Sequence, residues 1–272
     1  MRRLACLLAL SWLAACAAPF DPDQRLSIEV PTRAKVAGVP LIQQEDFFCG
    51  PTSIAMVMQW AGAEVTQQEV AALAFSPVAG GTYLADMIGS SRRLGQLAVE
   101  ISDFDQLLAE VTAGHPVIVF QNLGLGVFTV WHYGVVTGYD FAKDEIYLNS
   151  GQLNQMVMAF AVFERTWRRG DFWGLVVLPP NQLPVSVAEA DVLSAAAALE
   201  RVEQYQAAET LYETGALKWP ESWLWQFGLG NARYAQGDLR GARRALRRAR
   251  ALDPSIPEVR TNLAFVESEI AG

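Results

Sequence analysis

One cysteine, Cys49, stands where a chain could use a thiol as a nucleophile. It lies directly before Gly50-Pro51, at the start of an apolar stretch that predicts a helix over about 51–61. A thiol at a helix start lies at the positive end of the helix dipole, which favours the thiolate. With a histidine that takes and returns a proton, such a thiol is a cysteine nucleophile. The position of Cys49 therefore indicates a nucleophilic thiol.

The chain has two candidate bases, His115 and His132. His115 precedes a proline directly after a helix exit at Gly114, and we expect it to be structural. His132 opens a stretch rich in valine and aromatic residues, 131–139, that predicts a strand. Its ring would lie at a strand start, where a cleft can open at the sheet edge. We therefore expect His132 to be the base for Cys49.

Two further groups are needed, a donor to the oxyanion and a group that orients the imidazole. Gln43 lies six residues before Cys49, and its amide can donate to an oxyanion together with the Cys49 backbone N–H. Asn149 ends the strand that follows His132. Two adjacent antiparallel strands would bring it beside the histidine. Gln43 and Asn149 thus complete the predicted site.

The elements that must position these residues are helices first and strands later, between about 36 and 180. The predicted helices are 51–61, 66–75, 82–94 and 104–111, the second opened by a capping box of Thr66 and Glu69. The predicted strands are 99–101, 116–121, 131–139, 145–149, 156–160 and 173–178. Helices followed by antiparallel strands predict an α+β domain.

These segments resemble family 39 of the cysteine peptidases, the papain-like group that includes bacteriocin-leader processing domains. The resemblance rests on Gln43, on Cys49-Gly50-Pro51, on the stretch 132–140 and on Ile146-Tyr147-Leu148-Asn149, and it covers about residues 38–178. It implies a papain-like fold, with N-terminal helices packed on an antiparallel sheet. It also implies that Gln43 is the oxyanion donor, Cys49 the nucleophile and His132 the base and then the acid. The implied activity is hydrolysis of peptide bonds through a thioester on Cys49.

One position departs from the family pattern. The family usually has an aspartate as its third member, often followed by proline, and here the chain reads Asn149-Ser150-Gly151. Asn149 can orient a histidine by accepting from the ring N–H, but the aspartate can also correspond to Ser150. The missing aspartate leaves a non-catalytic adaptor, with a cleft that binds peptides, as an alternative. An acyltransferase that uses the same thioester is a third possibility.

Charge and composition restrict the partners. The formal net charge of -8 argues against nucleic acid. Residues 36–186 contain six basic and fourteen acidic side chains, so this part should repel acidic peptides and accept basic ones. Two histidines and a single thiol beyond the N-terminal segment provide no plausible zinc ligand set, and no metal or cofactor is expected. The expected ligand is a peptide or protein substrate.

The first fifteen residues have a secretory signal pattern that ends in Leu13-Ala14-Ala15-Cys16. The pattern resembles a bacterial lipoprotein signal, which implies cleavage before Cys16 and a lipid on its thiol. Ala17 in place of an acidic residue implies an outer-membrane anchor that faces the periplasm. An ordinary signal peptide with an incidental cysteine is the alternative. The polar residues that follow, 16–35, are expected to be a tether.

The last part of the chain is alanine-rich and helical. Pro220 and Pro254 lie 34 residues apart, the period of tetratricopeptide repeats, and small or apolar residues match before each proline. Two repeats are expected at 189–222 and 223–256, with one further helix to residue 270. An unrelated alanine-rich bundle is the alternative. Such repeats would dock a partner or substrate. The predicted order is signal peptide 1–15, tether 16–35, papain-like domain 36–180 and repeat region 187–272.

Overall fold

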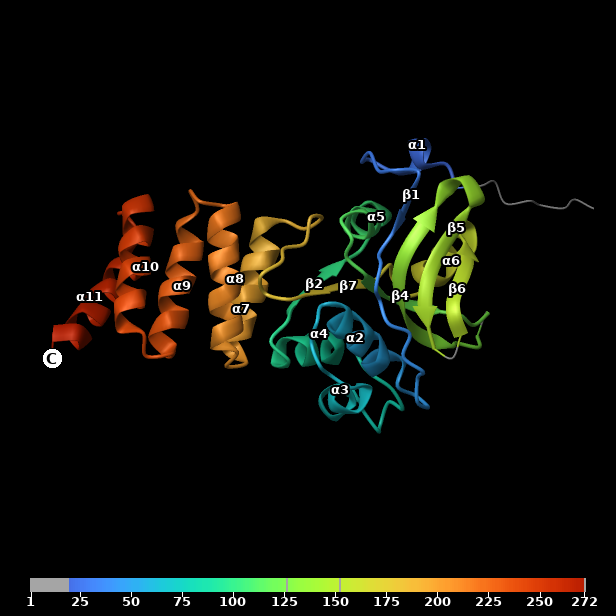
Figure 1. Ribbon diagram of the computed structural model, residues 1–272, viewed down its shortest axis with the longest axis horizontal. Coiled ribbons are helices and arrows are strands. Elements are labelled where there is room, and N and C mark those ends of the chain that lie inside the picture. Colours follow the sequence, from blue (N-terminus) through green and yellow to red (C-terminus); the bar gives the residue numbers. More distant parts are fainter. Residues whose placement is uncertain (1–19, 126, 152, 272) are drawn as a thin grey trace, which may run out of the picture.

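The computed structural model describes residues 20–125, 127–151 and 153–271. The predicted signal peptide, Cys16 with its predicted lipid, and the first part of the predicted tether lie outside the described residues. Figure 1 shows a central sheet with helices packed around it, and a row of helices that leads away from the sheet to the C-terminus.

The sheet is antiparallel, and its strands run in the order β2-β7-β3-β4-β5-β6, with β1 paired to β4 off this path. The strands are β1 (Arg33–Lys35), β2 (Leu97–Ile101), β3 (Val117–Asn122), β4 (Trp131–Asp140), β5 (Glu145–Ser150), β6 (Leu153–Ala159) and β7 (Gly174–Leu178). Each strand predicted from the sequence is present, with ends shifted by a few residues. The α+β prediction is confirmed.

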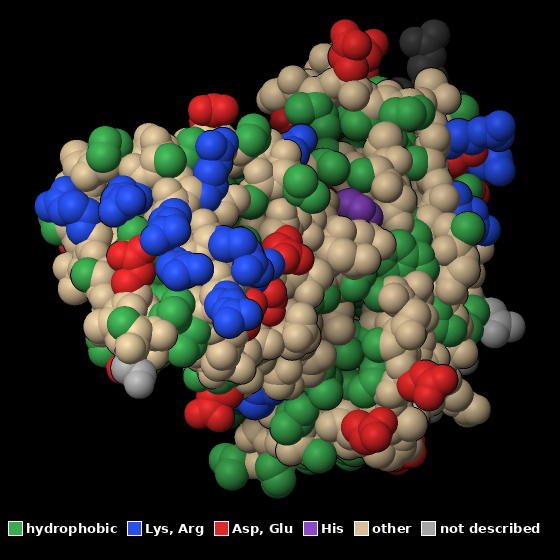
Figure 2. Space-filling model, turned by 60° about the vertical axis from the view of Figure 1, so that its left-hand side comes forward, with side chains coloured by type: hydrophobic (Ala, Val, Ile, Leu, Met, Phe, Trp, Pro, Cys, Tyr) green, Lys and Arg blue, Asp and Glu red, His purple; other side chains and the backbone are tan. Residues whose placement is uncertain are grey.

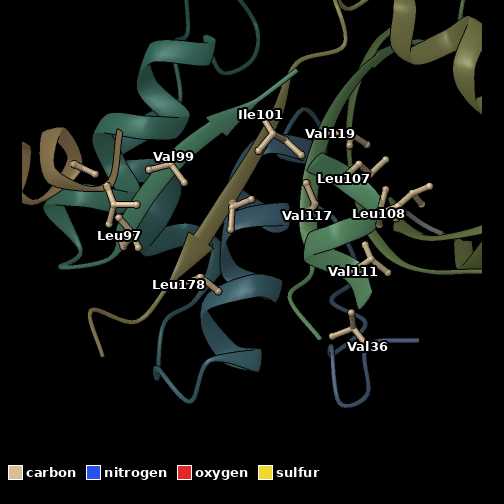
Figure 3. Packing of buried hydrophobic residues seen from close by; sticks show 14 of the residues in the cluster. Val36, Leu97, Val99, Ile101, Leu107, Leu108, Val111, Val117, Val119 and Leu178 are labelled. Atoms are coloured by element: carbon tan, nitrogen blue, oxygen red, sulfur yellow. The ribbon is translucent and has the colours of Figure 1, made fainter. Parts of the chain in front are cut away.

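Helices cover both faces of this sheet (Figure 1). They are α2 (Cys49–Trp60), α3 (Gln67–Ala74) and α4 (Leu84–Arg93) on one face, and α5 (Phe104–Thr112) and α6 (Phe160–Arg168) on the other. Successive side chains of a strand point to opposite faces. Val117 and Val119 of β3 therefore pack with Leu107 and Leu108 of α5 (Figure 3), whereas Ile118 between them packs in the cluster under α2.

Helix α6 corrects the sequence-based expectation, which continues a strand to Phe160. The chain turns into a helix at this residue. Phe160, Phe163 and Trp167 have the helical spacing i, i+3 and i+7, and all three side chains are fully buried. This helical period is visible in the sequence, but aromatic residues also favour strands. In so short a run, the period of a helix is hard to separate from that of a strand.

The predicted tether is wrong for residues 20–35, which pack on the sheet domain. Phe20 is buried and stacks on Phe160, with ring centroids 4.5 Å apart. The short helix α1 (Pro22–Arg25) follows, and its Arg25 forms an ion pair of 2.6 Å with Glu164. β1 then pairs with the end of β4. One buried aromatic ring and one strand pairing anchor a segment whose polar composition indicated a flexible chain.

The C-terminal region consists of packed helices, as the repeat period predicts. They are α7 (Glu189–Arg201), α8 (Tyr205–Lys218), α9 (Trp223–Ala235), α10 (Leu239–Leu252) and α11 (Pro257–Ala271). A Cβ on Gly228 of α9 would lie 2.2 Å from the ring of Tyr212 on α8. Glycine at this position lets the two helices approach closely. Each of the two expected repeats, 189–222 and 223–256, contains one helix pair, α7–α8 and α9–α10 respectively.

Basic side chains gather on the C-terminal helices, as Figure 2 shows. The outer face of α10 carries six arginines, of which all except Arg243 are exposed: Arg240, Arg243, Arg244, Arg247, Arg248 and Arg250. The opposite face of α10 is buried through small residues and Leu246. Among the described residues, no helix combines the length and the apolar character needed to cross a membrane.

The sheet domain and the helical region share one hydrophobic core. Val192 and Leu199 of α7 belong to the same buried cluster as Leu97 of β2 and Leu178 of β7. Helix α7 packs directly against β2. The boundary that the prolines near residue 180 predict is therefore a change in secondary structure and not a gap in the packing.

A buried carboxylate holds the segment between the two regions. One oxygen of Glu110 accepts from the backbone N–H groups of Val185 and Ser186, at 2.8 and 2.7 Å. Its other oxygen bonds Nδ1 of His115 at 2.6 Å. His115 therefore has a structural role, as its position in the sequence indicates.

Candidate active site

Cys49 is the first residue of α2 and is half-buried. No side chain caps this helix, so the N–H groups of its first turn are not taken up by a cap. The following residue must be small, because a Cβ on Gly50 would come within 2.9 Å of Thr82 and of the Met87 sulfur. The Cys-Gly pair thus lets the helix start lie tightly against the segment that leads into α4.

The protonation of Cys49 differs from the expectation. Burial raises the pKa of the Cys49 thiol, and backbone hydrogen bonds from Tyr133, Gly50 and Cys49 itself oppose this only in part. The helix start was expected to favour the thiolate, but in the resting site desolvation is the larger effect. The contact with the Tyr133 backbone places the sulfur next to the residue that follows His132.

His132 lies at the start of β4, and its Nε2 is 2.6 Å from Oγ of Ser150 at the end of β5. Burial lowers the pKa of His132, so the neutral imidazole is favoured. Ser150 occupies one ring nitrogen and leaves Nδ1 without a hydrogen bond to any other described residue. A neutral imidazole with a free nitrogen can accept a proton.

The structure does not bring Asn149 to this ring. The Asn149 amide donates to the backbone carbonyls of Val39 and Pro40, both at 3.3 Å. Adjacent residues of a strand point to opposite faces, so Asn149 and Ser150 cannot both face His132. Of the two residues left open for the third role, Ser150 is the one that contacts the His132 ring.

The structure also separates Gln43 from the site. The Gln43 side chain is exposed, and its backbone carbonyl accepts from Gln67 at 3.0 Å. Gln44 takes the predicted place, since it lines the same cavity as Cys49 and His132. The Gln44 Oε1 is buried and has no hydrogen-bond partner among the described residues. The Gln44 Nε2 makes no hydrogen bond to another described residue, so its N–H groups remain to donate to a ligand in the cavity.

Cys49, His132 and Gln44 line one cavity of about 550 Å³. The segment from Ala79 to Tyr83 forms another part of its wall. The hydroxyl of Tyr133 donates to the carbonyl of Thr82 at 2.9 Å, which fixes this wall to β4. Three exposed aromatic residues, Phe47, Tyr83 and Trp131, also line the cavity.

A second cavity of about 490 Å³ adjoins the first. Phe120 and Trp131 line both cavities, and their rings stack with centroids 4.9 Å apart. This second cavity is the far cavity relative to Cys49, and it is lined by residues of β2, of the segment before β7 and of α7. The two stacked rings thus form a wall common to both cavities.

The far cavity is acidic. Glu100, Asp171 and Asp191 line it, against a single guanidinium, Arg169. Arg169 donates to the carbonyl of Asn122 at 2.6 and 3.0 Å, so part of its donor capacity is already used. In the described residues, no group of three or more histidine, cysteine, aspartate or glutamate side chains is placed to hold a metal ion.

A thiol carried by a helix and an imidazole carried by a strand, in one cavity of an α+β fold, define a cysteine-peptidase-like domain. The sequence comparison assigns the family: the chain belongs to the Peptidase_C39 like family, whose sequence model matches residues 36–171, half of the chain. Residues 222–266 match the model of the tetratricopeptide repeat. No curated protein matches the chain.

Solved structures with a similar arrangement include a C39-like peptidase from Bacillus anthracis, 20% identical, with a TM-score of 0.46 over 54% of this chain and 97% of that one. A double glycine motif protease from an AMS/PCAT transporter, solved with the leader peptide, is 19% identical, with a TM-score of 0.43 over 53% and 93%. The peptidase domain of Streptococcus ComA is 19% identical, with a TM-score of 0.44 over 52% and 99%.

Proposed function

We propose that the protein is a cysteine peptidase that hydrolyses peptide bonds through a thioester on Cys49. The observation that carries this proposal is the common cavity of Cys49 and His132, in which Ser150 bonds Nε2 of the ring and leaves Nδ1 free. Family membership supports the same chemistry. An imidazole held through one nitrogen and open at the other is arranged as a general base.

In the proposed mechanism, Nδ1 of His132 takes the proton of the Cys49 thiol as the sulfur attacks the peptide carbonyl. The backbone N–H of Cys49 and the amide of Gln44 donate to the oxyanion. The imidazolium returns its proton to the leaving amine as the carbon–nitrogen bond breaks. His132 then takes a proton from water, which attacks the thioester and releases the acid and the thiol.

The test combines a peptide library with an electrophilic thiol probe. The wild-type protein should cleave members of the library, and mass spectrometry should find the probe on the peptide that carries Cys49. Probe labelling without cleavage would favour the peptide-binding adaptor over the peptidase. A product joined to an added amine, in place of the free acid, would indicate an acyltransferase.

Ser150 supports His132 with a neutral hydroxyl where the family usually has an aspartate. Ser150→Ala removes this hydrogen bond, so we expect kcat to fall about tenfold, with KM little changed. Ser150→Asp places a carboxylate beside the ring, which raises the pKa of His132 and moves the acidic limb of the kcat/KM profile to higher pH. A Ser150→Asp profile identical to the wild-type profile would contradict this role for residue 150.

We further propose that substrates lie across Phe120 and Trp131, with a basic side chain in the far cavity. Neutralising Asp171 or Asp191 (to asparagine) should raise KM roughly two- to fivefold for peptides that carry lysine or arginine there, as expected for exposed charge pairs. Peptides with a neutral residue at that position should be unaffected. Glu221→Gln, a loss of charge outside both cavities, is the matched control. Equal effects on basic and neutral peptides would contradict this preference.

Tetratricopeptide repeats serve in protein interactions, and we propose that the C-terminal helices dock a partner or the substrate protein. We also propose an anchor on the outer membrane, facing the periplasm, through a lipid on Cys16. This proposal depends on the sequence pattern alone, since Cys16 lies outside the described residues. Incorporation of a labelled fatty acid that persists in Cys16→Ser would count against the anchor.

A further inference from the structure

The side chain of Gln67 holds both peptide groups that flank Gln44. Its Nε2 donates to the carbonyl of Gln43 at 3.0 Å, and its Oε1 accepts from the N–H of Glu45 at 3.3 Å. These two backbone groups belong to the peptide units on either side of the Gln44 Cα. A primary amide offers one acceptor and two donors, so it can pair with them as a neighbouring strand would. The backbone at Gln44 is therefore fixed by a residue that is distant in sequence.

The same amide is tied to the helix that carries the thiol. The Oε1 of Gln67 also accepts from the hydroxyl of Thr52 at 2.6 Å, and Thr52 lies one turn after Cys49 on α2. Gln67 itself is fixed at the first position of α3, directly after the capping box of Thr66 and Glu69. Only 8% of its surface is exposed, so water competes weakly for these bonds. One amide thus connects the Gln44 backbone to the Cys49 helix.

The loop needs such support because it is irregular. Phe47 has a φ of 66°, in the left-handed region that a residue with a side chain rarely adopts. No regular helix or strand holds residues 43 to 48. The side chain of Gln44 nevertheless has to point at the cavity, with its Oε1 buried and without a partner among the described residues. The bonds of Gln67 provide the restraint that secondary structure does not.

We propose that Gln67 is a positioning residue that sets the Gln44 amide relative to the sulfur of Cys49. This inference rests on the proposed peptidase function. Gln67 does not line the cavity, so a substrate bound there would not contact its side chain. Its contribution is made through Gln44, in the step where negative charge forms on the carbonyl oxygen. It should therefore affect kcat and leave substrate binding unchanged.

The test is a double-mutant cycle in the full chain, with kcat and KM measured for one cleaved peptide. Gln67→Met should lower kcat about tenfold at unchanged KM, and Gln44→Ala should lower kcat about 100-fold, the size expected for one oxyanion donor. Once Gln44 is alanine, adding Gln67→Met should cost less than twofold, because the group that it positions is gone. Gln67→Glu keeps the acceptor for Thr52 and loses the donor to Gln43, and it should behave like Gln67→Met.

Gln59→Met is the matched control, since Gln59 makes one side-chain bond, to the carbonyl of Val65, at the other end of α2. It should leave kcat unchanged. If Gln67→Met lowers kcat by the same factor with and without Gln44, or raises KM alone, the inference is wrong and the peptidase function remains. If the wild-type protein cleaves nothing and Cys49 takes up no probe, the proposed function is wrong, and the positioning role fails with it.

Discussion

Cys49→Ala is expected to lower peptide cleavage by about 10⁴-fold or more, because no other described group in the cavity can form the thioester. The loss should appear in kcat. KM or peptide affinity should stay near the wild-type value, since the side chain that is removed is small and the cavity walls are untouched. Peptide cleavage followed by mass spectrometry, with affinity measured separately, gives both quantities.

Cys49→Ser is an informative companion variant. It keeps the shape of the site but offers a hydroxyl whose proton is harder to remove, so cleavage should remain close to the Cys49→Ala level. Cys49 is the free cysteine of the described residues, so uptake of a thiol probe by that part of the chain should vanish in both variants. Cleavage that survives in Cys49→Ala would show that another group is the nucleophile.

His132→Ala is expected to lower kcat by about 10²- to 10⁴-fold, the usual contribution of a general base. The reason is the raised pKa of the Cys49 thiol, which stays protonated near neutral pH without a base to take its proton. The remaining activity of His132→Ala should rise with pH, because hydroxide then generates the thiolate directly. Cleavage rates between pH 5 and pH 10 measure both effects.

The wild-type profile depends on the pKa of His132. The base acts as the neutral imidazole, and burial lowers its pKa below the ordinary value of about 6.5. Activity should therefore be retained below pH 6.5 and decline only as the pH falls through the lowered pKa. His115→Gln is the matched control, since it removes the other histidine, which bonds Glu110 and lies outside the cavity. A pH profile of His132→Ala equal to that of the wild type would contradict the role of His132.

The sequence predicted the elements that have a clear period or cap. Helix α2 with Cys49 at its start, the capping box of Thr66 and Glu69, and the strand that His132 opens are all present. These features are local, since each depends on a few neighbouring residues and on backbone hydrogen bonds. The pairing of Cys49 with His132 in one cavity could be expected because few other thiols or imidazoles exist in the chain.

The remaining site residues could not be chosen from spacing. Gln43 and Gln44 are adjacent in an irregular loop, and the turn at Phe47 decides which of them faces the sulfur. Asn149 and Ser150 are adjacent at the end of β5, and the register of β5 decides which of the two side chains faces His132. In both cases a shift of one residue would turn the other side chain of the pair toward the site, and the sequence has no local signal that shows which one it is.

The common core of sheet and helices has a consequence for whatever binds the repeats. Helix α7 packs against β2 within one buried cluster, so packed side chains connect the proposed docking helices to the sheet domain that contains the cavity. A protein bound to α8 to α11 would therefore have a defined orientation and distance relative to the sulfur of Cys49. Only a segment at the matching distance from the docked part of that protein could enter the cavity. The repeats would then select the position along the bound chain at which a peptide bond is cleaved.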